Sequence, residues 1–511
     1  MQSLTSSIIR SLTDPFRAAV LVFSAGFFLR LVPEMIAYPY PIGYDVINYY
    51  IPVLTNFDSH WHTTSHEFPL YVYLLHLLAI ATGFSPHITV LGSAAFMFGI
   101  FSVSIFVIGV RVLKITAAES VFLSAFVMIQ PVVLRTTWDL HKDVFTISLM
   151  FFAFSLITSS KESVYSNKLK LAASIIISSI IAISDRMVGG LFSLSLLTYA
   201  FRSRDRIAVL SSTAALCVFF IALFTSSNLW NDLKDKLIEH RQSVILNIGT
   251  NFGSYNPSDL LISFLVVNSF LIPSALLGLR LAKESKILKI PLLISLLGSF
   301  SWILFPNDAS LVANRWIILT GIFLSIFSGY GFIILSKIIG ARRLTVTCPV
   351  LLIVIVIFGI IGTSYIVLPY KSPFILYEIV RGSIGSFLPV TMQFNSVDIK
   401  DNHMLVSAIE WINNNTAPNS TIIGTSHLRG WMELELDNGR TFHFFNSKGS
   451  ELDYLRRTKV QNSYLIDFKG EIPSLPEAII DKVYSSEVMN IWKVSLYPVQ
   501  TRANNYQTSI K

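Results

Sequence analysis

The chain has 511 residues, of which 52% are hydrophobic and only 14% charged, and its mean hydropathy is +0.60. This composition excludes a soluble globular protein and indicates a polytopic membrane protein. The net charge of +8 does not indicate nucleic-acid binding, because the basic residues gather in short loops between apolar runs. The two cysteines, Cys217 and Cys348, lie in apolar runs and exclude a disulfide framework.

Apolar runs that could cross a bilayer recur throughout residues 18–368, which we expect to form an all-α transmembrane domain of about eleven helices. They are expected near 18–33, 88–110, 116–134, 144–160, 171–184, 187–201, 207–225, 259–280, 290–305, 316–336 and 345–368. The run 70–82 is shorter than the about 20 residues that a span needs. We therefore expect it to be an interfacial helix inside a large first external loop, residues 31–87.

The loop charges predict the orientation in the membrane. Loops on one side are almost purely basic, whereas loops on the other side contain the acidic residues. By the positive-inside rule, the N-terminal segment 1–17 is expected in the cytoplasm and the C-terminal part outside. The chain is thus predicted to be a multi-pass protein of the plasma membrane that contacts the lipid bilayer along its spans.

Beyond about residue 369 the composition becomes polar, as expected of a connector over 369–400 followed by a separate domain over 401–511. The patterns predict a small extracytoplasmic α/β domain. Its elements are expected to be a helix near 402–413 and strands near 421–425, 441–445, 462–468 and 490–497.

Ionisable residues converge on the outer ends of the predicted spans. Between Arg30 and Arg111 the chain has no lysine or arginine, yet this stretch is rich in acids and aromatics. Further groups of mixed sign follow at 135–143, at Asp185-Arg186 and at 305–315. Charged groups at membrane depth are costly and therefore suggest function. Such a set could hold a phosphate with its cations while a carboxylate handles a proton.

An ordered series of short motifs runs through about residues 15–370. It comprises Arg30-Leu31, Gly43-Tyr44-Asp45 with Tyr49-Tyr50, Phe68-Pro69-Leu70-Tyr71, Asp143 at the start of a span, and Asn314-Arg315-Trp316. In this series the chain resembles the GT-C superfamily of polyprenyl-phosphate-sugar glycosyltransferases, especially the protein O-mannosyltransferase and aminoarabinose-transferase branch.

The resemblance implies a membrane glycosyltransferase that moves a sugar from a polyprenyl- or dolichyl-phosphate donor to a hydroxyl of a protein or glycolipid acceptor. Asp45 matches the essential aspartate of the first loop and would be the general base of an inverting reaction. Val46 follows it, so the second acid found in some relatives is missing. Donor phosphate or sugar contacts are expected from Arg30, Asp139, His141, Lys142, Asp143 and Arg315. Acceptor or loop contacts are expected from Tyr49, Tyr50 and Glu67.

Other interpretations of these residues stay open. Asp45 could be a loop acid that caps the next helix, Arg315 an interfacial arginine, and residues 139–143 a self-neutralising loop. Asp185 and Arg186 could form a structural pair. No cofactor is expected, although a divalent metal could be held by the cluster His60, His62, His66 and Glu67.

Two other classes of function also compete with the enzyme. A transporter or flippase of a lipid-linked glycan would show repeat symmetry and charges in the middle of broken helices, whereas here the charges lie at the outer ends and no repeat is evident. A non-catalytic membrane scaffold would use its outer domain to bind a partner and would tolerate Asp45→Asn.

Overall fold

The computed structural model describes residues 14–43, 45–57, 70–158, 164–225, 261, 264–265, 268–282, 285–303, 313–340, 351–359, 402–425, 428–437, 439–445, 463–468 and 478–496. The chain divides into two compact units, Met1–Asn395 and Ser396–Lys511. The predicted fold class, a helical membrane protein with a small C-terminal sheet region, is confirmed.

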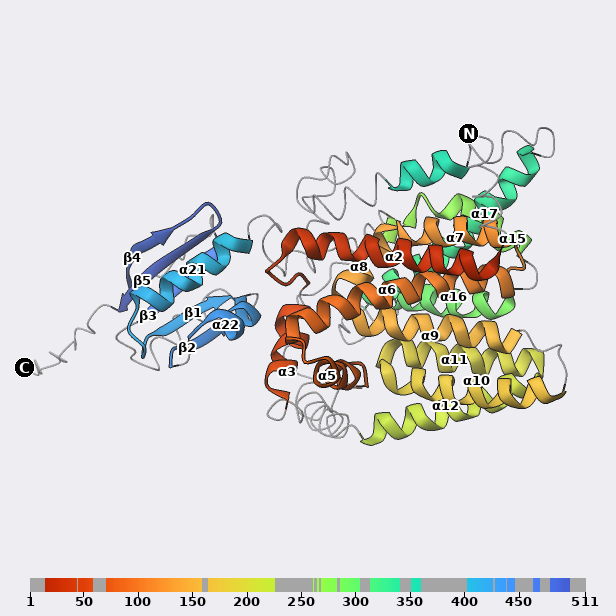
Figure 1. The fold of residues 1–511 in the computed structure, drawn as a ribbon, viewed down its shortest axis with the longest axis horizontal. Helices are drawn as coiled ribbons and strands as arrows, with labels where there is room; N and C mark the ends of the chain where they lie inside the picture. The colour runs from red at the N-terminus through yellow and green to blue at the C-terminus, as the bar shows by residue number, and fades with distance from the viewer. Residues whose placement is uncertain are drawn as a thin grey trace, which may run out of the picture. The chain divides into compact units, whose positions relative to one another are not determined.

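Among the described residues of the first unit, the regular elements are all helices (Figure 1). Its elements are α2 (Pro15–Ala37), the π-helical turn η1 (Val46–Tyr50), α3 (Ile51–Thr55), α5 (Leu70–Thr82), α6 (Pro86–Arg111), α7 (Ala117–Met128), α8 (Pro131–Asp139), α9 (His141–Thr158), α10 (Val164–Ser184), α11 (Arg186–Ser203), α12 (Arg206–Thr225), α15 (Ile272–Leu281), α16 (Lys286–Ser299), the short 3-10 helix η3 (Ser301–Ile303) and α17 (Ala313–Gly340). Residues 351–359 are also helical.

Within the described residues, five helices are long and apolar enough to cross a membrane: α2, α6, α9, most of α12 and most of α17. The run 70–82 is a helix, as expected, with the bounds of α5. The total of about eleven spans stays a prediction, because several of the remaining helices are shorter or less apolar than an isolated span requires.

The predicted single span 116–134 is two helices, α7 and α8. The break falls at Gln130-Pro131, where the proline has no N–H to continue the helical ladder. The Gln130 side chain donates to the Phe126 carbonyl at 2.7 Å and so satisfies an acceptor at the end of α7. Helix α8 then leads the chain into the start of α9, which carries His141, Lys142 and Asp143.

Local signals explain where the long helices begin. The Asp14 side chain accepts from the Phe16 N–H at 3.0 Å with Pro15 in the first turn of α2. Ser85 and Pro86 open α6 in the same way. Thr116 and Glu119 form a reciprocal capping box at α7. These caps satisfy backbone N–H groups of the first turn that have no partner within the helix.

Close helix packing brings the elements of the site together. In Figure 1, α2 lies beside α6, and α6 packs in turn on α7 and α9. Helix α17 packs against α15, α16 and α7. Its contact with α15 is very close: a Cβ on Gly278 would clash with the Phe327 backbone carbonyl oxygen, and a Cβ on Gly331 would clash with the Ser274 backbone carbonyl oxygen. Glycines are therefore required at this crossing, as is common between membrane helices.

The second unit is an α/β domain with a five-stranded sheet in the order β2-β1-β3-β5-β4. Its elements are α21 (Asn402–Asn415), β1 (Thr421–Thr425), α22 (Arg429–Glu435), β2 (Thr441–Phe445), β3 (Ser463–Phe468), β4 (Ala478–Ser485) and β5 (Met489–Leu496). Strands β2, β1 and β3 are parallel, whereas β5 is antiparallel to both β3 and β4. The predicted helix and four strands are present; β4 and α22 were not predicted.

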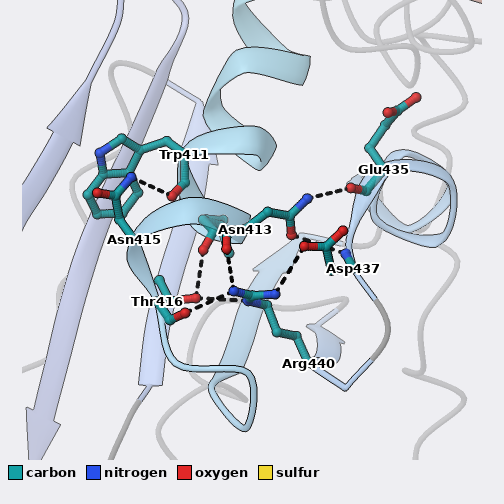
Figure 2. A network of polar contacts seen from close by, with 8 residues as sticks. Trp411, Asn413, Asn415, Thr416, Glu435, Asp437 and Arg440 are labelled. Carbon is teal, nitrogen blue, oxygen red and sulfur yellow. Dashed lines mark hydrogen bonds and ion pairs between the residues drawn. The ribbon is translucent and has the colours of Figure 1, made fainter.

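Arg440 joins the end of α21 to the start of β2 (Figure 2). Its guanidinium donates to the Thr416 hydroxyl at 3.0 Å, to the Thr416 carbonyl at 2.8 Å and to the Asn413 carbonyl. It also pairs with Asp437 at 3.4 Å. The Asn413 side chain in turn donates to the Glu435 carbonyl at 2.8 Å. One arginine thus satisfies carbonyls at the C-terminal end of a helix, where a cation is favoured.

The close packing of α15 against α17 can be tested by mutation. We expect Gly278→Ala to lower the stability by about 1–3 kcal/mol, because the added methyl meets backbone atoms that cannot move aside. Gly92→Ala is the matched control, since a Cβ at Gly92 of α6 would meet nothing within 4 Å. Thermal unfolding of the detergent-solubilised protein measures both. Equal midpoints for the two variants would contradict the packing described for α17.

Candidate functional site

Arg30 and Glu34 form a buried ion pair one helical turn apart on α2. Only 2% of Arg30 and 3% of Glu34 are exposed, so each charge needs the other. The Arg30 Nε also donates to the Thr137 carbonyl at 3.1 Å, which ties α2 to α8. The predicted contact of Arg30 with the donor phosphate stays a prediction; the contacts found here hold two helices together.

Asp45 stands directly before η1, at the start of the first loop's helical part. Its side chain makes no capping hydrogen bond, so helix capping does not account for it. The turn that follows is π-helical, a rare geometry that is often found at functional sites. Gly43 precedes it with φ +106°, a conformation that favours glycine. Asp45 is half-buried and contributes to the electrostatic field at both Tyr50 and Arg315.

Tyr50 docks the first loop onto the start of α9. Its ring stacks on His141, with centroids 5.3 Å apart and planes 9° from parallel. Its hydroxyl accepts from the Lys142 backbone N–H at 3.4 Å. Burial, together with the charge of Asp45, raises the pKa of the Tyr50 phenol, which therefore stays neutral. The rings of Tyr49 and Tyr71 lie 5.3 and 5.7 Å from that of Tyr50.

Asp185 connects the start of α11 to the start of α9. Its carboxylate accepts from the N–H groups of Met187 at 2.8 Å and Val188 at 2.7 Å, and thus caps α11. The same carboxylate lies 3.7 Å from the Lys142 ammonium. Burial acts to raise the pKa of Asp185, but the Lys142 charge and the Val188 N–H outweigh it and hold the pKa below its ordinary value. Asp185 is therefore an anion at neutral pH.

Asp143 and Arg315 are the remaining two charged residues of this region. Asp143 and Asp185 lie close enough for the charges of their carboxyl groups to interact. Arg315, at the start of α17, faces the charges of Asp143, Asp45 and Asp185. We call these five residues, Asp45, Lys142, Asp143, Asp185 and Arg315, the charged cluster. The charged cluster thus brings three carboxyl groups near two cationic side chains.

The cluster unites several predicted site residues from distant parts of the sequence. Asp45, Lys142, Asp143 and Arg315 belong to it, and Tyr50 and His141 border it. The side chain of Asp139, and the whole of His60, His62, His66 and Glu67, lie outside the described residues. Where the structure describes the chain, no group of three or more His, Cys, Asp or Glu residues could hold a metal ion.

Two residues of this region were missed as parts of a site. Asp185 was interpreted beside its neighbour Arg186, but its ion pair is with Lys142, and Arg186 is exposed. Glu34 is not among the predicted site residues, although its i,i+4 spacing from Arg30 indicates a helical ion pair. No local signal in the sequence connects Asp185 with Lys142.

Comparison with known proteins bears on the fold. Neither a protein-family model nor a curated protein sequence matches the chain. The crystal structure of ArnT from Cupriavidus metallidurans bound to undecaprenyl phosphate matches with a TM-score of 0.53 and 13% identity, over 93% of this chain and 97% of ArnT. The apo structure of that ArnT matches with a TM-score of 0.52, 13% identity and the same coverage.

A cryo-EM structure of the arabinofuranosyltransferase AftD from Mycobacteria also matches, with a TM-score of 0.52 and 11% identity, over 93% of this chain and 40% of AftD. ArnT, an aminoarabinose transferase, and AftD are both GT-C glycosyltransferases. The chain therefore has the membrane fold of these two proteins, which is the fold that the resemblance implied. At these identities the likeness establishes the fold alone.

The Arg30–Glu34 pair yields a stability prediction. We expect Glu34→Gln to destabilise the protein by about 3 kcal/mol, because the buried guanidinium of Arg30 would lose its ion pair with Glu34. Arg17→Met on the same helix is the control: it breaks an exposed ion pair with Asp14 and should change little. Thermal unfolding in detergent compares them. A Glu34→Gln variant as stable as Arg17→Met would show that the pair is not buried as described.

Proposed function

We propose that the chain is a membrane glycosyltransferase that moves a sugar from a polyprenyl- or dolichyl-phosphate donor to a hydroxyl acceptor, with inversion at the anomeric carbon. The observation that carries the proposal is the charged cluster, in which Lys142 and Arg315 lie beside three carboxyl groups. The fold supports it, since the ArnT of that fold was crystallised with undecaprenyl phosphate.

The cations suit the donor. A phosphate that links lipid and sugar is an anion, and it gains charge as the bond to the sugar breaks. Arg315 offers a planar fork of donors and Lys142 a compact point charge, the two groups that proteins use to hold phosphate. In a setting of low dielectric, such preorganised cations stabilise the developing charge strongly. We assign donor phosphate binding to Lys142 and Arg315.

One base completes the reaction. Asp45 takes the proton from the acceptor hydroxyl as that oxygen bonds to the anomeric carbon, while the bond from this carbon to the phosphate oxygen breaks. The lipid phosphate leaves with the electron pair and stays paired with Lys142 and Arg315. Attack from the face opposite the phosphate inverts the anomeric centre. No second acid and no metal ion are needed for this step, since the phosphate is already a good leaving group.

The remaining predicted residues take supporting roles in this proposal. Asp143 and His141 border the donor cations, and Asp139 and Arg30 stay candidates for contacts with the donor. Tyr49 and Glu67 stay candidates for the acceptor side. For Tyr50 the stacking on His141 favours a positioning role over direct acceptor contact, because its ring is fully buried.

The setting of the reaction is also part of the proposal. We place the cluster on the extracytoplasmic side of the plasma membrane, with the N-terminus in the cytoplasm and the C-terminal α/β domain outside. The acceptor would be a protein or a glycolipid. A flippase would carry the lipid-linked sugar without breaking its glycosidic bond, and a scaffold would not bind it at all, so product analysis separates the three.

The proposal predicts the effect of removing the base. With the protein reconstituted in liposomes with lipid-phosphate sugars, we expect Asp45→Asn to reduce transfer at least about 100-fold, as loss of a general base does. Binding of undecaprenyl phosphate should persist, because Lys142 and Arg315 are intact. Asp14→Asn, an exposed helix cap that asparagine can replace, should transfer sugar like the wild type. Transfer by Asp45→Asn at the wild-type rate would refute Asp45 as the base.

A further inference from the structure

We propose that Asp185 is a positioning residue of this site: it holds the Lys142 ammonium in place, so that the charged cluster can accept an anionic headgroup. The inference rests on the proposed function, since it concerns the same phosphate site. It adds a residue to which the sequence motifs assign no role.

The position of Asp185 is fixed by its own backbone contacts. Two N–H groups of the first turn of α11 donate to its carboxylate, and the side chain is only 1% exposed. An acid held in this way cannot swing out to solvent. It is therefore a rigid reference point from which a second side chain can be oriented.

Lys142 is the side chain that needs such orientation. A lysine side chain is long and flexible, and it carries about 2 kcal/mol of rotamer entropy. Here its backbone N–H is bonded to the Tyr50 hydroxyl, and its ammonium lies 3.7 Å from Asp185. An ammonium group has three donors, and a contact of this length leaves donors for a phosphate. Asp185 thus restrains Lys142 without consuming its hydrogen-bonding capacity.

Asp185 affects the binding of a phosphate in two opposite ways. Its negative charge disfavours a nearby anion, whereas its restraint of Lys142 favours one. We expect the restraint to dominate, because the hydrogen bonds from the Met187 and Val188 N–H groups already compensate part of the charge of Asp185. The sign of the mutational effect therefore decides between the two.

The test is Asp185→Asn, which keeps the cap of α11 but removes the charge that holds Lys142. Undecaprenyl phosphate is the probe, with the full-length protein in lipid nanodiscs. We expect its affinity to fall about tenfold, within the range of coupling between neighbouring charged side chains. Asp205→Asn is the matched control: Asp205 accepts from the Ile207 N–H at 3.1 Å at the start of α12, so this variant should bind like the wild type.

A double-mutant cycle with Lys142→Met separates positioning from a general structural role. If Asp185 acts through Lys142, Asp185→Asn should weaken binding much less in a Lys142→Met background than in the wild type. Equal losses of affinity in both backgrounds would show that Asp185 supports the fold of the site and does not act through Lys142. If Asp185→Asn does not fold, Asp185→Ser, which also caps a helix, takes its place in the cycle.

The remaining outcomes are distinct. An unchanged or increased affinity in Asp185→Asn would overturn the positioning role while leaving the proposed function in place. Failure of the wild-type protein to bind undecaprenyl phosphate, and to transfer sugar from any lipid-phosphate donor, would overturn the proposed function and this inference together.

Discussion

Charges buried among apolar helices must be balanced by other charges, and the arrangement of the first unit follows from this constraint. Asp143 is 3% exposed and Asp185 1%, and the desolvation of each carboxylate costs several kcal/mol unless cations and N–H groups compensate. The compensation comes from Lys142, Arg315 and the first turn of α11. Because these groups belong to α9, α17 and α11, the three helix starts have to meet. A balanced cluster of this kind is also a site that can bind an anion.

The first loop depends on the same junction. Tyr50 stacks on His141 and accepts from the Lys142 N–H, so the segment after Asp45 is fixed to the start of α9. On the other side of the loop, Arg30 holds the Thr137 carbonyl of α8. Asp45 therefore lies between two anchored segments, where its charge reaches Arg315. A base at this point can act next to a cation-bound phosphate, which is the arrangement that a single-displacement sugar transfer needs.

Much of this architecture could be predicted from the sequence, because length and apolarity determine where a chain can form helices in a membrane. The short helix 70–82 and the strands near 421–425 and 441–445 are found as expected. The break at Pro131 was missed, although the proline was a visible signal. Asp185 was paired with the wrong neighbour for a different reason: its partner Lys142 is distant in sequence, and only the packing of α9 and α11 brings the two together. Motifs could thus point to Asp45 and Arg315, but tertiary contacts decide which charges face them.

The central claim is that Lys142 and Arg315 hold the phosphate of a lipid-linked donor next to Asp45. A cryo-EM structure of the wild-type protein in nanodiscs that contain undecaprenyl phosphate tests it most directly. The account predicts density for the phosphate in contact with the Lys142 ammonium and the Arg315 guanidinium, with the Asp45 carboxylate facing the position of the sugar. Density for the lipid phosphate at another place, with Lys142 and Arg315 paired only to carboxylates, would contradict it.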